Sequence, residues 1–213
     1  CMGVCSGFAI PVAQKFGSKD YHALRKFVAN SVWVSVVFAA VMTVVVCLFC
    51  MDILRVMKTP SDIIQEAYDY IFVIFLGIPV TYLYNLLAGI IRALGDSKTP
   101  VYFLILSSVI NIVLDIVSIG VLHMGVAGPA WATVISQGAS GLLCLFYMIK
   151  KFEILHIQKD EWAYDGSYVK TLCGMGVPMG LQYSITAIGS VLLQVAVNGL
   201  GSLAVAAITA GNK

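Results

Sequence analysis

Charged residues are scarce in this sequence of 213 residues, and those present are gathered into a few short stretches. Asp, Glu, Lys and Arg make up 11% of the chain, whereas about a quarter of an ordinary soluble domain is charged. A soluble core of this length needs a charged exterior, so water is excluded as the solvent for most of this surface. Apolar residues reach 60% and the mean hydropathy is +0.92, which leaves a lipid bilayer as the solvent.

A cationic surface and a catalytic pattern are also lacking. The net charge is only +2, with lysines and arginines interleaved with acids, which excludes a nucleic-acid partner. The three histidines stand singly in connections, and we interpret them as surface residues (His22, His123 and His156). No residue pattern supports a hydrolase, so we expect neither an enzyme nor a cofactor.

The six cysteines lie in apolar runs, which favours buried thiols over a disulfide framework. Cys47 and Cys50 form a C-x-x-C pair, but no His lies nearby and the surrounding run is hydrophobic, which argues against a metal or redox site. The chain begins at Cys1 without an initiator Met and ends at Lys213, about ten residues into a new apolar segment. We therefore expect both ends to continue in a longer protein.

Long apolar runs divide the chain into membrane spans. Residues 27–51 form one uncharged run, which at about 1.5 Å per residue exceeds the roughly 30 Å thickness of the hydrocarbon layer. Strands of a β-barrel are excluded, because they are about ten residues long and alternate in polarity. The predicted fold class is an all-α, polytopic membrane helix bundle with five complete transmembrane helices and a partial one at each end. The remaining complete spans are 70–91, 101–122, 125–149 and 171–197, and the partial spans are 1–14 and 203–213.

The connections between spans differ in charge, which predicts their sidedness. An excess of Lys and Arg marks the cytoplasmic side of a membrane. Ten lysines and arginines fall in the first, third and fifth connections, and two fall in the second and fourth. The odd-numbered connections are therefore predicted to be cytoplasmic. The longest of them, 150–170, reads as a linker, and its Trp162 and Tyr164 suit the headgroup level of the membrane.

Three short segments carry turn or cap signals. Thr59-Pro60-Ser61-Asp62 is typical of a helix start, with a capping Thr, a Pro at the first helical position and an acid in the first turn. The segment 95–100 ends in Lys-Thr-Pro but lacks the glycine pattern of a phosphate loop, so we interpret it as a tight cytoplasmic turn. The segment 198–202 is predicted to be the turn before the last partial span.

Asp115 is the only formal charge inside any complete span. A carboxylate near the centre of a bilayer costs on the order of 2.5–3.5 kcal/mol, so its presence indicates a function. It lies about fourteen residues past Val101, roughly 21 Å from the cytoplasmic end of its helix, which places it in the outer half of the membrane. Binding of a proton or a sodium ion would remove the cost of the charge.

Polar residues extend from Asp115 along one helical face and recur on the next helix. Ser108, Asn111 and Asp115 are spaced by three and four residues, and so are Thr133, Gln137 and Ser140. Two neighbouring helices with such stripes predict a shared polar cavity. Gln182, Thr186 and Ser190 repeat the spacing close to Pro178, which fits either another cavity face or small-residue helix packing.

Several segments resemble the MATE (multidrug and toxic compound extrusion) family of transporters. The resemblance is carried by the run from Ala88 to Pro100, by Asn111 with Asp115, and by the run from Gly125 to Thr133. It extends to the turn Gly17-Ser18-Lys19-Asp20 and to Gly176-Val177-Pro178. Members have twelve helices in two lobes around a central cavity and export drugs in exchange for protons or sodium.

The resemblance implies a place in that architecture for each part of the chain. Residues 1–149 would belong to the N-terminal lobe, 150–170 would be the cytoplasmic connection between lobes, and 171–213 would start the C-terminal lobe. Asn111, Asp115 and Thr133 match three members of the cation site of proton-linked relatives. Thr186 stands where some members carry a sodium-binding Glu, which argues against that second site. No metal site is expected beyond sodium at Asp115.

The sequence thus predicts a cation-coupled antiporter, with a proton or sodium as coupling ion, that exports drugs or other amphipathic or cationic compounds. The predicted site consists of Asp115, Asn111 and Thr133 for the cation and of Ser108, Gln137, Ser140, Gln182 and Thr186 for the substrate. A flippase for lipid-linked oligosaccharides is the alternative, although no Lys or Arg lies inside a complete span to hold its phosphate. We expect a monomer in a bacterial cytoplasmic membrane, with the bilayer and a small-molecule substrate as partners.

Overall fold

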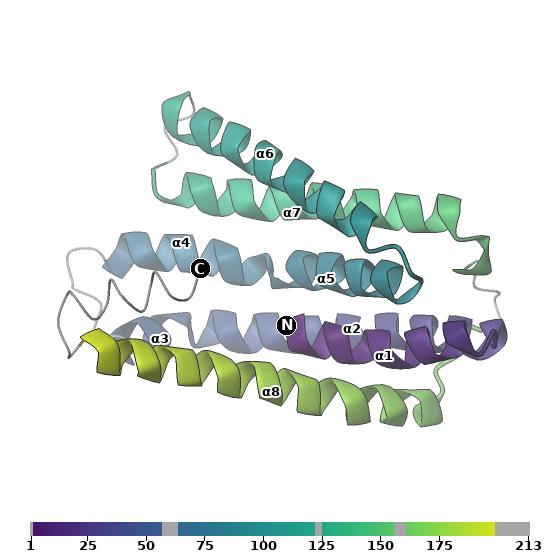
Figure 1. Ribbon diagram of the computed structural model, residues 1–213. Helices are drawn as coiled ribbons and strands as arrows, with labels where there is room; N and C mark the ends of the chain where they lie inside the picture. The colour runs from purple at the N-terminus through teal and green to yellow at the C-terminus, as the bar shows by residue number, and fades with distance from the viewer. Residues whose placement is uncertain (1, 57–63, 122–124, 156–160, 199–213) are drawn as a thin grey trace.

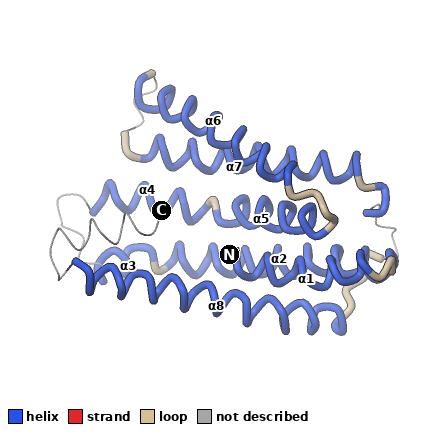
Figure 2. The backbone as a smooth tube through the Cα atoms, viewed as in Figure 1, coloured by secondary structure: helices blue, strands red, loops and turns tan. Residues whose placement is uncertain are grey.

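The computed structural model describes residues 2–56, 64–121, 125–155 and 161–198, which form helices joined by short turns (Figure 1). Within these ranges no strand occurs, as Figure 2 shows, so the predicted all-α fold is confirmed. The elements are α1 (Met2–Gly17), α2 (Tyr21–Leu48), α3 (Cys50–Val56), α4 (Ile64–Leu76), α5 (Ile78–Ala93), α6 (Lys98–Gly120), α7 (Ala127–Lys151), the short 3₁₀ helix η1 (Glu153–Leu155) and α8 (Gly166–Asn198).

Helix α5 is central to the bundle. It contacts α7 on one side and α1 and α2 on the other, while α7 also packs against α4 and α6. Helix α1 lies between α5 and α8, so α8 is joined to the rest of the bundle through α1 and α2 (Figure 1). The core is apolar, and its most buried large side chains include Phe8, Leu24, Tyr82, Leu86, Ile90, Ile91 and Leu172.

The outer faces of α2 and α6 are apolar and exposed. Val37 and Val41 on α2 and Ile112 and Ile116 on α6 each have more than half of their surface open. Within the described part of the chain, α2, α6 and α7 are long and apolar enough to cross a membrane, and the bent pair α4–α5 makes a fourth if counted as one span. Helix α8, with 33 residues, covers the predicted span 171–197. The exposed apolar faces of α2 and α6 suit contact with lipid.

The stretch predicted as the span 70–91 is broken into α4 and α5, which meet at Gly77 with a bend of 41°. Pro79 stands in the first turn of α5, where its missing N–H costs no hydrogen bond. A Cβ at Gly77 would lie 2.5 Å from Cγ2 of Val134, so the glycine lets α7 approach the bend closely. The predicted helix start at 59–62, the residues 199–202 of the predicted turn and the partial span 203–213 lie outside the described residues.

Two turns at one end of the bundle are closed by aspartates. Asp20 caps α2 by accepting a hydrogen bond from the backbone N–H of Ala23 at 3.2 Å. Asp96 accepts one from the backbone N–H of Thr99 at 3.1 Å, after Gly95 has turned the chain with a φ of 91°. These turns and the start of α8 lie at the same end in Figure 1, so the basic connections predicted to be cytoplasmic share one side of the bundle.

Candidate functional site

A polar cavity of about 210 Å³ lies between α5, α6 and α7. Three helices supply its polar lining, because each presents side chains three and four residues apart toward the others. These are Thr81 and Asn85 from α5, Ser107, Ser108 and Asn111 from α6, and Thr133, Ser136 and Gln137 from α7. The cavity brings together four of the predicted site residues, Asn111, Thr133, Ser108 and Gln137.

Asn111 and Thr133 join α6 to α7 inside this cavity. The Asn111 amide nitrogen lies 3.4 Å from the Thr133 hydroxyl, to which it donates. Thr133 in turn donates its hydroxyl hydrogen to the Pro129 carbonyl at 2.9 Å, so it accepts from the amide while satisfying its own helix. This arrangement leaves the carbonyl oxygen of the Asn111 side chain as an acceptor, the atom type that hard cations and protonated groups bind.

Thr81 and Gln137 form the second link across the cavity, from α5 to α7. The Thr81 hydroxyl donates to the side-chain oxygen of Gln137 in a short contact. The Gln137 amide hydrogens then remain as donors. Neighbouring Asn85 donates to the Thr81 carbonyl at 2.7 Å. The cavity wall therefore holds both donors and acceptors, which suits a ligand with several polar groups.

Asp115 lies one turn beyond Asn111 on α6, outside the residues that line the cavity. Its Oδ1 atom is inaccessible to solvent and has no hydrogen-bond partner among the residues that the structure describes. A buried carboxylate oxygen without a partner is costly, and such groups in native proteins usually have a functional reason. A proton or a bound cation at this oxygen would remove the cost. Within the described ranges, no three His, Cys, Asp or Glu residues cluster as a metal site, so any ion here would rely on uncharged oxygens beside Asp115.

The other predicted cavity residues lie elsewhere. Ser140 is buried and donates to the Phe103 carbonyl at 3.1 Å, so it ties α7 to α6 beside the cavity. On α8, Gln182 and Thr186 are exposed, and the Thr186 hydroxyl donates to the Gln182 carbonyl at 2.9 Å. Ser190 makes the same local bond to Thr186. The structure thus separates the polar stripe of α8 from the cavity between α5, α6 and α7.

A second cavity of about 230 Å³ adjoins the first toward the end with the basic turns. The two share Met2, Tyr84, Asn85 and Leu104 in their linings. Sequence reasoning missed the α5 contribution to both, although Thr81, Asn85 and Arg92 follow helical spacing on one face. Arg92 lies in the last turn of α5 and was counted with the cytoplasmic turn, yet it lines this second cavity.

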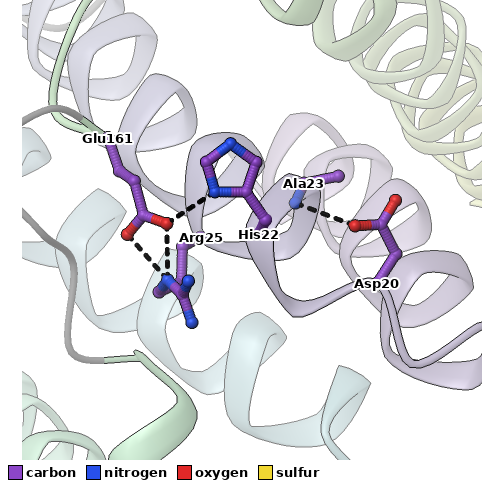
Figure 3. A network of polar contacts seen from close by, with 5 residues as sticks. All are labelled: Asp20, His22, Ala23, Arg25 and Glu161. Carbon is purple, nitrogen blue, oxygen red and sulfur yellow. Dashed lines mark hydrogen bonds and ion pairs between the residues drawn. The ribbon is translucent and has the colours of Figure 1, made fainter.

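Figure 3 shows an ion-pair network that connects the linker before α8 to α2. Glu161 accepts from Nε of Arg25 at 2.6 and 2.8 Å, and Nδ1 of His22 lies 2.9 Å from the same carboxylate. His22, which stands singly in its connection, thus has an acidic partner 139 residues away in sequence. His22 is nonetheless exposed, as predicted, and His123 and His156 lie outside the described residues.

The linker 150–170 is attached to α2 by further hydrogen bonds. The Trp33 indole N–H donates to the Trp162 carbonyl at 3.2 Å, and the Asp165 N–H donates to the Asn30 side chain at 3.0 Å. The Trp162 and Tyr164 side chains are exposed at this level. The described part of the linker thus packs along α2 through these hydrogen bonds. It also exposes the two aromatic side chains that suit the membrane interface.

The turn before α6 is closed by a second network around Asp96. The hydroxyls of Thr99 and Tyr147 each donate to Asp96 Oδ2 at 2.7 Å, and Lys151 Nζ lies 3.6 Å from it. The hydrogen bond from Tyr147, followed by that from Thr99, holds the pKa of the Asp96 carboxyl well below its usual range. Of the six cysteines, the five in the described ranges are free thiols; Cys5, Cys50 and Cys144 are buried, as predicted, whereas Cys47 and Cys173 are half-buried.

Comparisons with known proteins agree with this fold. The sequence profile of the MatE family matches residues 1–117. The chain is 33% identical over 213 residues to the probable multidrug resistance protein YoeA of Bacillus subtilis (strain 168), covering 97% of this chain and 46% of that relative. It is 38% identical over 153 residues to the probable multidrug resistance protein YpnP of the same organism, covering 70% and 33%. The chain therefore spans less than half the length of these relatives.

A crystal structure of a MATE protein in a bent conformation superposes with a TM-score of 0.85 at 25% identity, over 98% of this chain and 47% of that one. Bundled apolar helices around a cavity lined by polar side chains are typical of part of a multi-pass membrane protein. The chain belongs to the MATE family, which confirms the resemblance read from the sequence.

Proposed function

We propose that the protein containing this chain is a cation-coupled antiporter that exports drugs or other amphipathic or cationic organic compounds across a bacterial cytoplasmic membrane. The observation that carries the proposal is the Asn111–Thr133 contact inside a polar cavity, one helical turn from the unpartnered carboxylate oxygen of Asp115. The names of the two Bacillus subtilis relatives, both probable multidrug resistance proteins, support the substrate class.

Coupling follows from the electrostatics of α6. A deprotonated Asp115 without a bound cation has an unfavourable free energy in an apolar helix. A proton or a sodium ion at its buried oxygen lowers that free energy. Cation binding then favours one arrangement of α6 and α7, and substrate binding in the neighbouring cavity favours another. Two ligands that favour different states of one element compete, which is the minimum requirement for exchange.

A flippase for lipid-linked oligosaccharides is the second candidate, and one observation favours it. Arg92 lines the second cavity, so a cationic group is available for a phosphate. Against this, Arg92 is the only Lys or Arg among the described residues that line either polar cavity, and the neighbouring walls are apolar or uncharged. A single cation suits a small amphipathic molecule better than a diphosphate-linked glycan.

The test is gradient-driven transport by the full-length protein in everted membrane vesicles. Vesicles with the protein should accumulate a cationic fluorescent dye when either a pH gradient or a sodium gradient is imposed, and the effective gradient identifies the coupling ion. Vesicles from cells with the empty vector provide the control. Absence of accumulation under both gradients, together with translocation of a fluorescent lipid-linked oligosaccharide, would replace the antiporter with the flippase.

A further inference from the structure

Arg92 presents a guanidinium group to the second cavity, and no carboxylate among the described residues pairs with it. Its Nε donates to the Ala88 carbonyl at 3.1 Å, one turn earlier on α5, which holds the base of the guanidinium group against the helix. The two terminal nitrogens make no hydrogen bond to any other residue in the part of the chain that the structure describes. They form a planar fork of donors, the geometry that binds carboxylate and phosphate with two parallel hydrogen bonds.

Two other side chains that line the second cavity can also donate hydrogen bonds. The Ser6 hydroxyl lines the same cavity, and Asn85 uses one amide hydrogen on the Thr81 carbonyl and keeps the other. Tyr84 uses its hydroxyl hydrogen on the Pro100 carbonyl at 3.1 Å. Tyr84 is thereby left as an acceptor only, and an oxyanion of the ligand would bind the donors of Arg92, Ser6 and Asn85.

The rest of the second cavity suits an apolar body attached to the oxyanion. Its walls include Met2, Val101, Leu104 and the ring of Tyr183, which comes from α8. Thr81, in the first cavity, precedes Arg92 by eleven residues on the same face of α5, a separation of about 16 Å along the helix. An elongated amphiphile could therefore bind Arg92 at one end and reach the Thr81–Gln137 contact at the other.

We propose that Arg92 is a specificity-determining residue that binds a carboxylate or similar oxyanion at one end of an amphipathic, zwitterionic substrate. The interaction selects among the compounds that the cavities admit and favours those with a negative group at the cytoplasmic end. The inference rests on the proposed function, since it assigns a substrate class to the same cavities. Arg92 lies one residue outside the predicted span 70–91, so the inference adds a cationic group to cavities whose sequence-predicted residues include none.

Rhodamine B and its ethyl ester are a matched pair of probes, because they share the cationic ring system and differ in the free carboxylate. Transport of each dye is measured in everted vesicles that contain the full-length transporter, under the gradient that drives it. In Arg92→Gln we expect the KM for rhodamine B to rise about tenfold, as for loss of a charge-assisted hydrogen bond, and the KM for the ester to change less than about twofold. Arg92→Lys keeps the positive charge but lacks the planar guanidinium group. Its KM for rhodamine B should therefore lie between those of wild type and Arg92→Gln.

Lys98→Gln is the matched control. It removes a cation at the same end of the bundle, from a residue that lines a different depression together with Asp96 and Lys151. We expect both KM values of this variant to equal those of wild type. The ratio of the two KM values is independent of the amount of transporter in the membrane, so reduced expression does not obscure the result. If Arg92→Gln fails to reach the membrane, the ratio of the two KM values measured in Arg92→Lys decides whether the inference stands.

The outcomes separate the inference from the proposed function. A KM ratio that stays at the wild-type value in the Arg92 variants overturns the inference, and so does a wild type that transports only the ester; both leave drug antiport intact. A wild type that transports neither dye under either gradient overturns the proposed function together with the inference. A selective loss of rhodamine B transport in Arg92→Gln establishes the carboxylate contact.

Discussion

The Glu161 carboxylate is bound by Arg25 at 2.6 and 2.8 Å while only 1% of its side chain is exposed. Removing one partner of a buried ion pair leaves the other uncompensated, which is strongly destabilising. We expect Glu161→Gln to lower stability by about 1–3 kcal/mol, because Arg25 keeps some access to water. The measurement is the apparent melting temperature of the purified full-length protein in detergent.

The exposed pair between Lys15 and Asp20, at 3.2 Å, provides the comparison for Glu161. Surface ion pairs contribute about 0–1 kcal/mol, so Lys15→Gln should leave the melting temperature almost unchanged. Equal melting temperatures for Glu161→Gln and Lys15→Gln would show that the contact with Arg25 does not hold the linker before α8 against α2.

A pH-dependent contribution is expected from Asp96. Its pKa in the folded protein is held below the usual range, chiefly by the hydrogen bond from Tyr147, so the charged form stabilises the fold. This contribution is fully present above the ordinary Asp pKa of about 3.9 and is lost as the pH falls below that value toward the lowered one. Asp96→Asn should therefore lower the melting temperature at pH 6, and the difference from wild type should shrink below about pH 4.

Tyr147→Phe isolates the cause of the shift at Asp96. It removes the hydroxyl that donates to Oδ2 at 2.7 Å and keeps the ring. Its destabilisation should be smaller than that of Asp96→Asn and should show the same dependence on pH. A melting-temperature difference that is constant from pH 7 to pH 4 and below in both variants would contradict the role assigned to the carboxylate.

Close packing of α1 on α8 depends on glycines. A Cβ at Gly7 would lie 2.5 Å from the Cα of Gly176, and backbone cannot move aside as a flexible side chain can. Gly7→Ala should therefore destabilise the protein by about 1–3 kcal/mol, as overpacking does. Gly174→Ala is the control, because a Cβ there meets nothing within 4 Å and alanine favours the helix by up to about 1 kcal/mol. If the two variants melt at the same temperature, α1 and α8 are not in this contact.

The sidedness of the membrane helices is tested by labelling. In a background without other cysteines, Asp62→Cys should react with an impermeant thiol reagent added outside intact cells, because it lies in the connection with few lysines and arginines. Ser97→Cys lies in an exposed position of the basic turn before α6 and should react only after the cells are opened. The reverse pattern would invert the topology.

Side chains of the cavity should contribute less to transport than the carboxylate. Asn111→Ala and Thr133→Ala each remove one member of the α6–α7 contact, which is long at 3.4 Å, and should reduce gradient-driven dye transport without abolishing it. Thr43→Val is the matched control, because among the described residues the Thr43 hydroxyl bonds only to the Ala39 carbonyl of its own helix α2. Full activity in both cavity variants would remove Asn111 and Thr133 from the site.

The helical fold could be predicted from the sequence because uncharged runs longer than a bilayer leave no other regular structure. The polar residues of α6 and α7 that line the cavity could also be predicted, since Asn111, Thr133 and Gln137 follow helical spacing on neighbouring helices. Arg92 was missed because it stands one residue outside an uncharged run, although its helix turns it toward the second cavity. The partner of Glu161 was not predictable, because an ion pair between residues 136 positions apart depends on how α2 and the linker meet.

The break at Gly77 illustrates a different limit of the sequence. Gly77 and Pro79 signal a bend, but 70–91 is apolar throughout and reads as one span. Only the approach of Val134 shows why the glycine is needed there. Similarly, the spacing of Gln182 and Thr186 is the same as that of the cavity residues, and it is the packing of α8 on α1 and α2 that leaves them exposed.

The coupling role of Asp115 is tested most directly by gradient-driven dye transport in everted vesicles that contain the full-length Asp115→Asn variant. The amide is nearly isosteric and places no charge beside the buried position of Oδ1, so the variant should reach the membrane at the wild-type level, as a blot checks. It can no longer exchange a proton or bind sodium as a carboxylate does. We expect no dye accumulation under an imposed pH or sodium gradient; accumulation at the wild-type rate would show that Asp115 is not the coupling site.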